Sequence, residues 1–184
     1  MILVIDTSSP SSSVIGTIDG EQMSESVSAG RGLDMELLRR IARARRITKV
    51  AVASGPGSFT GLRVGVSFGL GLAKGLGVPI VPLPTLELQA ARTDEPVTAV
   101  ADAGRGRFYF LVPGGEVTLG GPADIPKTYP LVGRMAQLEG LRFKPEKELR
   151  RVVEAAAKML ETAREVPYGS LEIEYMQSFS ASKK

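Results

Sequence analysis

Apolar residues stand along the chain in two patterns, short continuous runs and longer segments with helical spacing. Apolar runs of about four to eight residues are typical of buried strands, whereas apolar residues three and four positions apart are typical of helices that cover a sheet. Strands that alternate with helices predict an α/β fold. Strands are expected at 2–6, 13–18, 21–28, 49–54, 78–82, 97–102, 107–112, 130–133 and 171–176, helices at 33–46, 60–76, 85–92 and 146–164, and turns over 113–130.

The segment 53–65 joins a strand to a helix through a turn rich in glycine and proline. Gly55-Pro56-Gly57 is expected to form this structural turn, with at least one glycine at positive φ, where alanine would be strained. A hydroxyl group from Ser58 or Thr60 can cap the helix. The first backbone N–H groups of such a helix are also a place where an anion can bind.

The helix expected at 60–76 carries an unusual number of glycines on one side. Each interior glycine costs about 1 kcal/mol relative to alanine, so another backbone is expected to pack closely against this side. That backbone belongs either to the chain's own core or to a partner, and the sequence leaves both interpretations open. The glycines within one half of the helical wheel are Gly61, Gly65, Gly69, Gly71 and Gly75, and a second apolar face holds Leu62, Val66, Leu70 and Ala73.

An internal repeat links the two halves of the chain. Residues 3–8 and 13–18 read as an apolar strand, a turn that begins with Asp6, and a second strand. Residues 99–104 and 107–112 have the same form, with Asp102 in the corresponding place. Aspartate also favours turns for local reasons, so each one by itself has an ordinary structural explanation.

Three blocks of sequence resemble the bacterial TsaB family, also called YeaZ: residues 1–8 (MILVIDTS), 55–65 (GPGSFTGLRVG) and 78–87 (VPIVPLPTLE). Their order and spacing match that family through residue 110. The resemblance implies a two-lobed actin-like (ribonuclease H-like) α/β fold, with mixed sheets flanked by helices and a shortened second lobe. The lobes are expected at 1–95, which carries the partner-binding helices, and 96–184, with Glu95-Pro96 at the boundary.

The resemblance also implies a function in tRNA modification. Family members act as non-catalytic partners and activators of TsaD, the subunit that transfers a threonylcarbamoyl group to N6 of an adenosine, with TsaE supplying ATPase activity. We therefore expect pairing with TsaD and TsaE homologues, a homodimer when the chain is alone, and contact with tRNA only through the assembled complex. The expected partner interface comprises Leu33, Leu37, Ile41, Thr60, Gly61, Leu62, Gly65, Val66 and Gly69.

The actin-like resemblance suggests phosphate or nucleotide contacts where the two hairpins meet. The sequence, however, has neither a P-loop nor a G-x-G-x-x-G pattern, and its second half shows no segment suited to an adenosine pocket. No cofactor of its own is expected, although ATP or ADP with Mg²⁺ at a subunit interface fits the resemblance. The alternative is a stand-alone nucleotide-binding phosphotransferase or hydrolase that uses the two aspartates. Candidate contacts are Asp6, Thr7, Ser8, Asp102 and Gly104.

Composition narrows the possible chemistry. The sequence has no cysteine and no histidine, which excludes thiol catalysis, a Ser-His-Asp triad and ordinary zinc sites. We therefore expect no catalytic residues and no metal site. No run approaches the ~20 apolar residues that span a bilayer, and the first strand begins without a basic leader, so a cytoplasmic, membrane-free location is expected.

A basic cluster lies along the helix expected at 33–46 and just after it, in a chain of formal net charge +3. Cations near the carboxyl end of a helix complement its dipole, which is the simpler explanation for the cluster. Contact with RNA phosphates is the functional alternative, but no interleaved aromatic residues support base stacking. The cluster contains Arg39, Arg40, Arg43, Arg45, Arg46 and Lys49.

Overall fold

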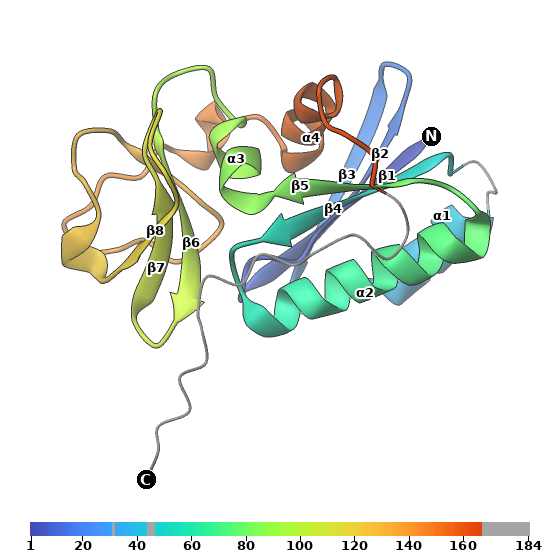
Figure 1. Ribbon diagram of the computed structural model, residues 1–184, viewed down its shortest axis with the longest axis horizontal. Coiled ribbons are helices and arrows are strands. Elements are labelled where there is room, and N and C mark those ends of the chain that lie inside the picture. Colours follow the sequence, from blue (N-terminus) through green and yellow to red (C-terminus); the bar gives the residue numbers. More distant parts are fainter. Residues whose placement is uncertain (31, 44–46, 167–184) are drawn as a thin grey trace, which may run out of the picture.

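The computed structural model describes residues 1–30, 32–43 and 47–166. Its strands form two mixed β-sheets (Figure 1). The first sheet has the strand order β3-β2-β1-β4-β5, in which β1 pairs antiparallel with β2 and parallel with β4. The second has the order β8-β7-β6-β9. The strands of the first sheet are β1 (Ile2–Asp6), β2 (Ser12–Asp19), β3 (Gln22–Ala29), β4 (Lys49–Gly55) and β5 (Ile80–Pro84).

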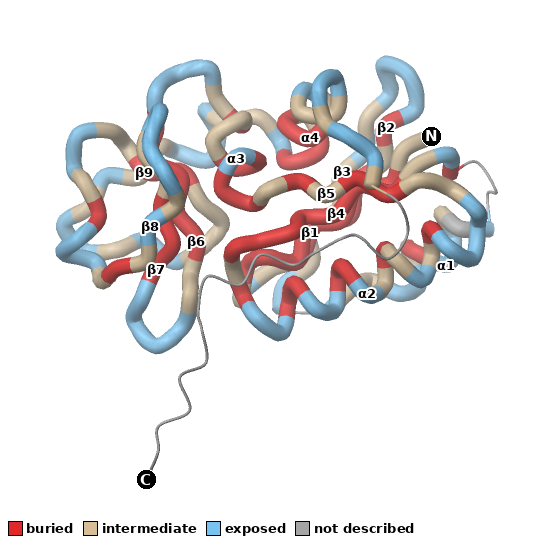
Figure 2. The backbone as a smooth tube through the Cα atoms, in the orientation of Figure 1, coloured by how far each residue is buried: buried red, intermediate tan, exposed pale blue. Residues whose placement is uncertain are grey.

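Helices cover both faces of the first sheet (Figures 1 and 2). On one face, Leu38 and Val66 pack with Leu3 and Ile5 of β1. On the other face, α4 packs against Val4 and its neighbours in the sheet. The result is a three-layer α/β/α lobe, with its apolar core divided between the two faces of the sheet. The helices are α1 (Met35–Arg43), α2 (Phe59–Leu76), α3 (Thr85–Ala90) and α4 (Val152–Leu160).

The second sheet repeats the pairing of the first. Antiparallel β6 and β7 correspond to β1 and β2, and β9 pairs parallel with β6 as β4 does with β1. The predicted internal repeat is therefore present in the fold. The structure also contains a strand, β8, within the segment expected to contain only turns. This strand was not predicted because three residues are too few to show an alternation of apolar and polar positions. These strands are β6 (Thr98–Gly104), β7 (Arg107–Leu111), β8 (Thr118–Gly120) and β9 (Leu131–Val132).

The boundaries of α2 follow from its caps. Ser58 accepts a hydrogen bond from the Gly61 amide at 3.4 Å, and Gly77 ends the helix at a φ of 67°. The Val78 amide then donates to the Ala73 carbonyl at 3.0 Å. Because this cap occupies residues 77 and 78, β5 begins at Ile80, two residues later than predicted.

The last described helix corrects two predictions. Residues expected to form one helix at 146–164 instead make a 3-10 turn at Glu146–Glu148 and then α4, with Leu149 in extended backbone between them. Glu25 of β3 accepts a hydrogen bond from the Val153 amide at 2.8 Å and so fixes the start of α4. α4 therefore returns to the first lobe, and the assignment of all of 96–184 to the second lobe is wrong for this helix. The strand predicted at 171–176 lies outside the described residues.

Candidate functional site

The turn predicted at Gly55-Pro56-Gly57 holds the start of α2 against the end of β1. The φ of Gly55 is 114°, which confirms the predicted positive φ. A Cβ atom on Gly57 would lie 2.8 Å from the Ser8 carbonyl oxygen, and the same oxygen accepts a hydrogen bond from the Ser58 amide at 2.8 Å. Both glycines are therefore required by the structure, one for its conformation and one for a close approach between backbones.

The amino-terminal glycines of α2 pack on the chain's own sheet. The Thr7 hydroxyl donates to the Gly61 carbonyl at 2.7 Å. A Cβ atom on Gly61 would overlap the Thr7 carbonyl oxygen, one on Gly65 would overlap the Thr7 hydroxyl, and one on Gly69 would overlap the Val52 side chain. For these three glycines the close neighbour is the chain itself.

This packing corrects part of the predicted partner interface. Gly61, Leu62, Gly65, Val66 and Gly69 are all buried in the first lobe, where the side chains of Leu62 and Val66 are 1% and 2% exposed. A residue covered by its own sheet offers no surface to another chain. The sequence could not decide between packing on the chain's own core and packing on a partner, because Thr7 and Val52 are far from α2 in sequence and contact it only in the folded structure.

The carboxyl-terminal glycines of α2 face outward. Gly71 and Gly75 are exposed, and a Cβ atom on either would lie more than 4 Å from every other described residue outside the helix. They share one side of α2 with Thr60, also exposed, and with Val64, which is 39% exposed. The outer face of α2 is defined here as Thr60, Val64, Ser67, Gly71 and Gly75.

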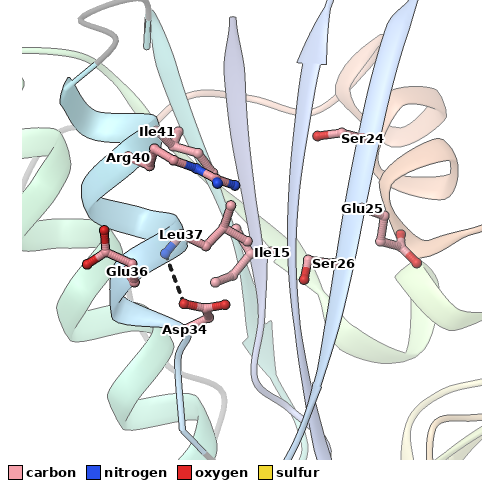
Figure 3. Close-up of a pocket in the computed structure, with 9 residues that line it drawn as sticks. All are labelled: Ile15, Ser24, Glu25, Ser26, Asp34, Glu36, Leu37, Arg40 and Ile41. Atoms are coloured by element: carbon pink, nitrogen blue, oxygen red, sulfur yellow. Dashed lines mark hydrogen bonds between the residues drawn. The ribbon is translucent and has the colours of Figure 1, made fainter.

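The remaining predicted interface residues lie on or just before α1. Leu33, Leu37 and Ile41 are half-buried, and they pack against the same core as α2. α1 begins where the Asp34 carboxylate accepts a hydrogen bond from the Leu37 amide at 2.9 Å. An open groove of about 360 Å³ separates α1 from β2 and β3 (Figure 3). Leu37 and Ile41 line it beside Arg40, so one side of each remains accessible.

Four members of the predicted basic cluster lie among the described residues, three on α1 and one at the start of β4. Arg39, Arg40 and Arg43 are exposed on α1, and Arg39 lies 4.0 Å from Glu36. Lys49 forms an ion pair with Glu165 at 2.8 Å. Arg45 and Arg46 lie outside the described residues.

The two aspartates of the repeat lie where the lobes meet, but they differ in burial and in partners. Asp6 is fully buried, and its carboxylate accepts hydrogen bonds from the Ser8 amide at 2.9 Å and the Ser8 hydroxyl at 2.6 Å. Its other oxygen forms an ion pair with Arg134 at 3.0 Å. Asp102 is half-buried and accepts a hydrogen bond from the Gly104 amide at 2.6 Å, as expected of a turn aspartate.

The space between these hairpins is small. A cavity of about 10 Å³ lies between Ser8 and Ser9 of the first lobe and Asp102 and Arg134 of the second. That volume is close to what one water molecule needs, so this arrangement of the lobes has no room for a nucleotide. Sequence inspection missed Arg134, because no local pattern marks its pairing with a residue 128 positions away.

Comparisons with known proteins agree with the fold. The family model described as "TsaD: tRNA N6-adenosine threonylcarbamoyltransferase" matches residues 36–184. The chain belongs to this family. The predicted resemblance to TsaB (YeaZ) proteins and the actin-like fold are both confirmed by the relatives that follow.

Two curated relatives carry the name "tRNA threonylcarbamoyladenosine biosynthesis protein TsaB". The one from Bacillus subtilis is 41% identical over 66 residues, which cover 34% of this chain and 29% of the relative. The one from Haemophilus influenzae is 31% identical over 122 residues, 59% of this chain and 52% of the relative. The matched segments thus span about half the length of these relatives, or less. The solved structure of YeaZ from Pseudomonas aeruginosa covers 95% of this chain and 99% of its own at 18% identity, with a TM-score of 0.70, and shows the shared fold.

Proposed function

We propose that this chain is an accessory, non-catalytic subunit of the machinery that makes N6-threonylcarbamoyladenosine in tRNA, and that it acts by binding a TsaD-type catalytic subunit. The names of the relatives support the process. The absence of histidine and cysteine from the sequence and the filled junction between the two aspartates support a role other than catalysis. Nothing in the described residues favours the stand-alone phosphotransferase or hydrolase.

The observation that carries this proposal is the outer face of α2. Interior helix glycines cost about 1 kcal/mol each, and contacts with the described residues do not offset that cost at Gly71 and Gly75. Residues without side chains allow another backbone to approach closely, and the adjoining Val64 adds exposed apolar surface. A second protein packed along this face explains all three residues.

The proposal extends to the partners and to the place where they meet. The outer face of α2 and the open side of α1 bind a second copy when the chain is alone and the TsaD homologue when it is present. TsaE and tRNA join through the assembled complex, and any ATP or ADP with Mg²⁺ binds at a subunit interface. No helix among the described residues is long and apolar enough to cross a membrane, and we propose that the complex is cytoplasmic.

To test the proposal directly, the chain is mixed with the TsaD of its own organism, and the mass of the complex is measured with and without ATP. Gly71→Leu and Gly75→Leu add bulk to the outer face of α2 and are expected to weaken association roughly ten- to a hundredfold. Gln137→Leu, at an exposed position of the second lobe, is the control and leaves association unchanged.

Each part of the proposal has its own contradicting result. Failure of the unmodified chain to bind TsaD contradicts the accessory role. Binding that survives both leucine variants contradicts the assigned surface only. ATPase, kinase or peptidase turnover by the pure chain that disappears in Asp6→Ala or Asp102→Ala contradicts the non-catalytic role.

A further inference from the structure

One arginine of the second lobe contacts the β1–β2 hairpin of the first lobe. Arg134 lies two residues after the end of β9, and its side chain is only 9% exposed. One terminal nitrogen donates to the Asp6 carboxylate at 3.0 Å, and the other donates to the Ser12 hydroxyl at 2.7 Å. Both partners belong to the β1–β2 hairpin, so this guanidinium group joins the two lobes in addition to the packing of α3 against β6 and β7.

The backbone around Arg134 is held on the side of the second lobe. β9 pairs with β6 through Leu131 and Val132. The next residue, Gly133, lies so close to the Val100 carbonyl oxygen that a Cβ atom would overlap it. The backbone of Arg134 is therefore held by the second sheet, while its side chain contacts Asp6 of the first sheet.

We propose that the Arg134–Asp6 ion pair is an internal latch, which holds the two lobes in one relative orientation and keeps their junction closed. The fully buried Asp6 carboxylate has its charge compensated by this arginine, and the remaining cavity of about 10 Å³ is what the guanidinium leaves. A ligand larger than a water molecule can enter the junction only after the pair separates.

The sequence contains no cysteine, so spin labels can be placed at two introduced cysteines without other changes. Glu21→Cys in the β2–β3 turn and Glu116→Cys before β8 put one label on each lobe, at exposed positions. The distance distribution between the labels is measured in full-length protein, diluted with unlabelled chain to remove distances between molecules.

In this background, Arg134→Gln and Asp6→Asn are each expected to broaden the distribution between the lobes and to lower the melting temperature by on the order of 10 °C. The double variant is expected to broaden it no further than either single change, because both act through one pair. Arg142→Gln removes the same charge from an exposed position of the second lobe and is expected to change neither quantity.

An unchanged distribution in Arg134→Gln overturns the latch, even if the melting temperature falls, because the pair would then stabilise the fold without orienting the lobes. If Arg134→Gln is unfolded at 25 °C, Arg134→Lys decides. Lysine keeps the charge but loses the two-pronged contact with Asp6 and Ser12. A distribution broader than that of Arg142→Gln supports the latch, and one identical to it overturns the proposal.

Discussion

The two ends of α2 use glycine for different purposes. At the amino-terminal end, Gly61 and Gly65 have no side chains, so Thr7 can approach the helix and hydrogen-bond to it within the same chain. At the carboxyl-terminal end, Gly71 and Gly75 weaken the helix, and an added Cβ atom would touch none of the described residues. Glycines on one half of the same helical wheel therefore pack in the core at one end of the helix and lie on an exposed surface at the other end.

The largest expected effect breaks the amino-terminal contact. Gly61→Ala places a Cβ atom against the Thr7 carbonyl oxygen, which belongs to the backbone and cannot rotate away. The free energy of unfolding is expected to fall by about 2–3 kcal/mol, measured by urea denaturation. An unchanged stability would show that α2 is free to move away from β1, and it would remove the distinction between the two ends.

An effect of intermediate size tests the same distinction with a larger side chain. Gly69→Leu is expected to destabilise the isolated chain by about 1–3 kcal/mol, because it presses on Val52 in the sheet. Gly71→Leu, two residues away but in open space, is expected to leave the melting temperature unchanged or higher. Calorimetry on both variants checks this, and equal losses in the two would contradict it.

A smaller effect, of opposite sign, sharpens the comparison. Gly71→Ala and Gly75→Ala remove the helix-propensity cost of glycine, and the added methyl group meets no other part of the chain that the structure describes. Each is expected to raise the free energy of unfolding by up to about 1 kcal/mol, less at Gly75, which lies near the end of the helix. Urea denaturation of the monomer measures this gain, and a loss of stability would mean that these glycines have a partner within the chain.

The smallest effect concerns an exposed ion cluster away from α2. Hydrogen bonds from Arg150 and then Lys158 lower the pKa of Asp94 from 3.8 to about 2. A carboxylate with a lowered pKa contributes stability above its unfolded pKa, and this contribution is lost as the pH falls through 3.8 towards 2. Asp94→Asn is therefore expected to narrow the difference in melting temperature between pH 7 and pH 2 slightly. A change in stability as large as that expected for Gly61→Ala would contradict the expectation that exposed ion pairs contribute less stability than buried contacts.

Much of the fold could be predicted because its signals are local. The strand runs, the turn at Gly55 and the two hairpins that begin with Asp6 and Asp102 all depend on residues close together in sequence. Local signals were misread for 146–164, where α4 starts only at Val152, with a local cap from Glu154 and a hydrogen bond from the Val153 amide to Glu25 of a distant strand. The strand β8 was also missed, because it is too short to carry a pattern.

The candidate site was predicted less completely, for a physical reason. The glycines of α2 and the aspartates of the repeat are visible in the sequence by residue type and spacing, and the lack of histidine and cysteine limits the chemistry whatever the fold. Which glycines meet the core depends on Thr7 and Val52, and what neutralises Asp6 depends on Arg134, far along the chain. Periodicity records which face of an element is apolar or small, but only the tertiary structure determines which neighbour that face meets.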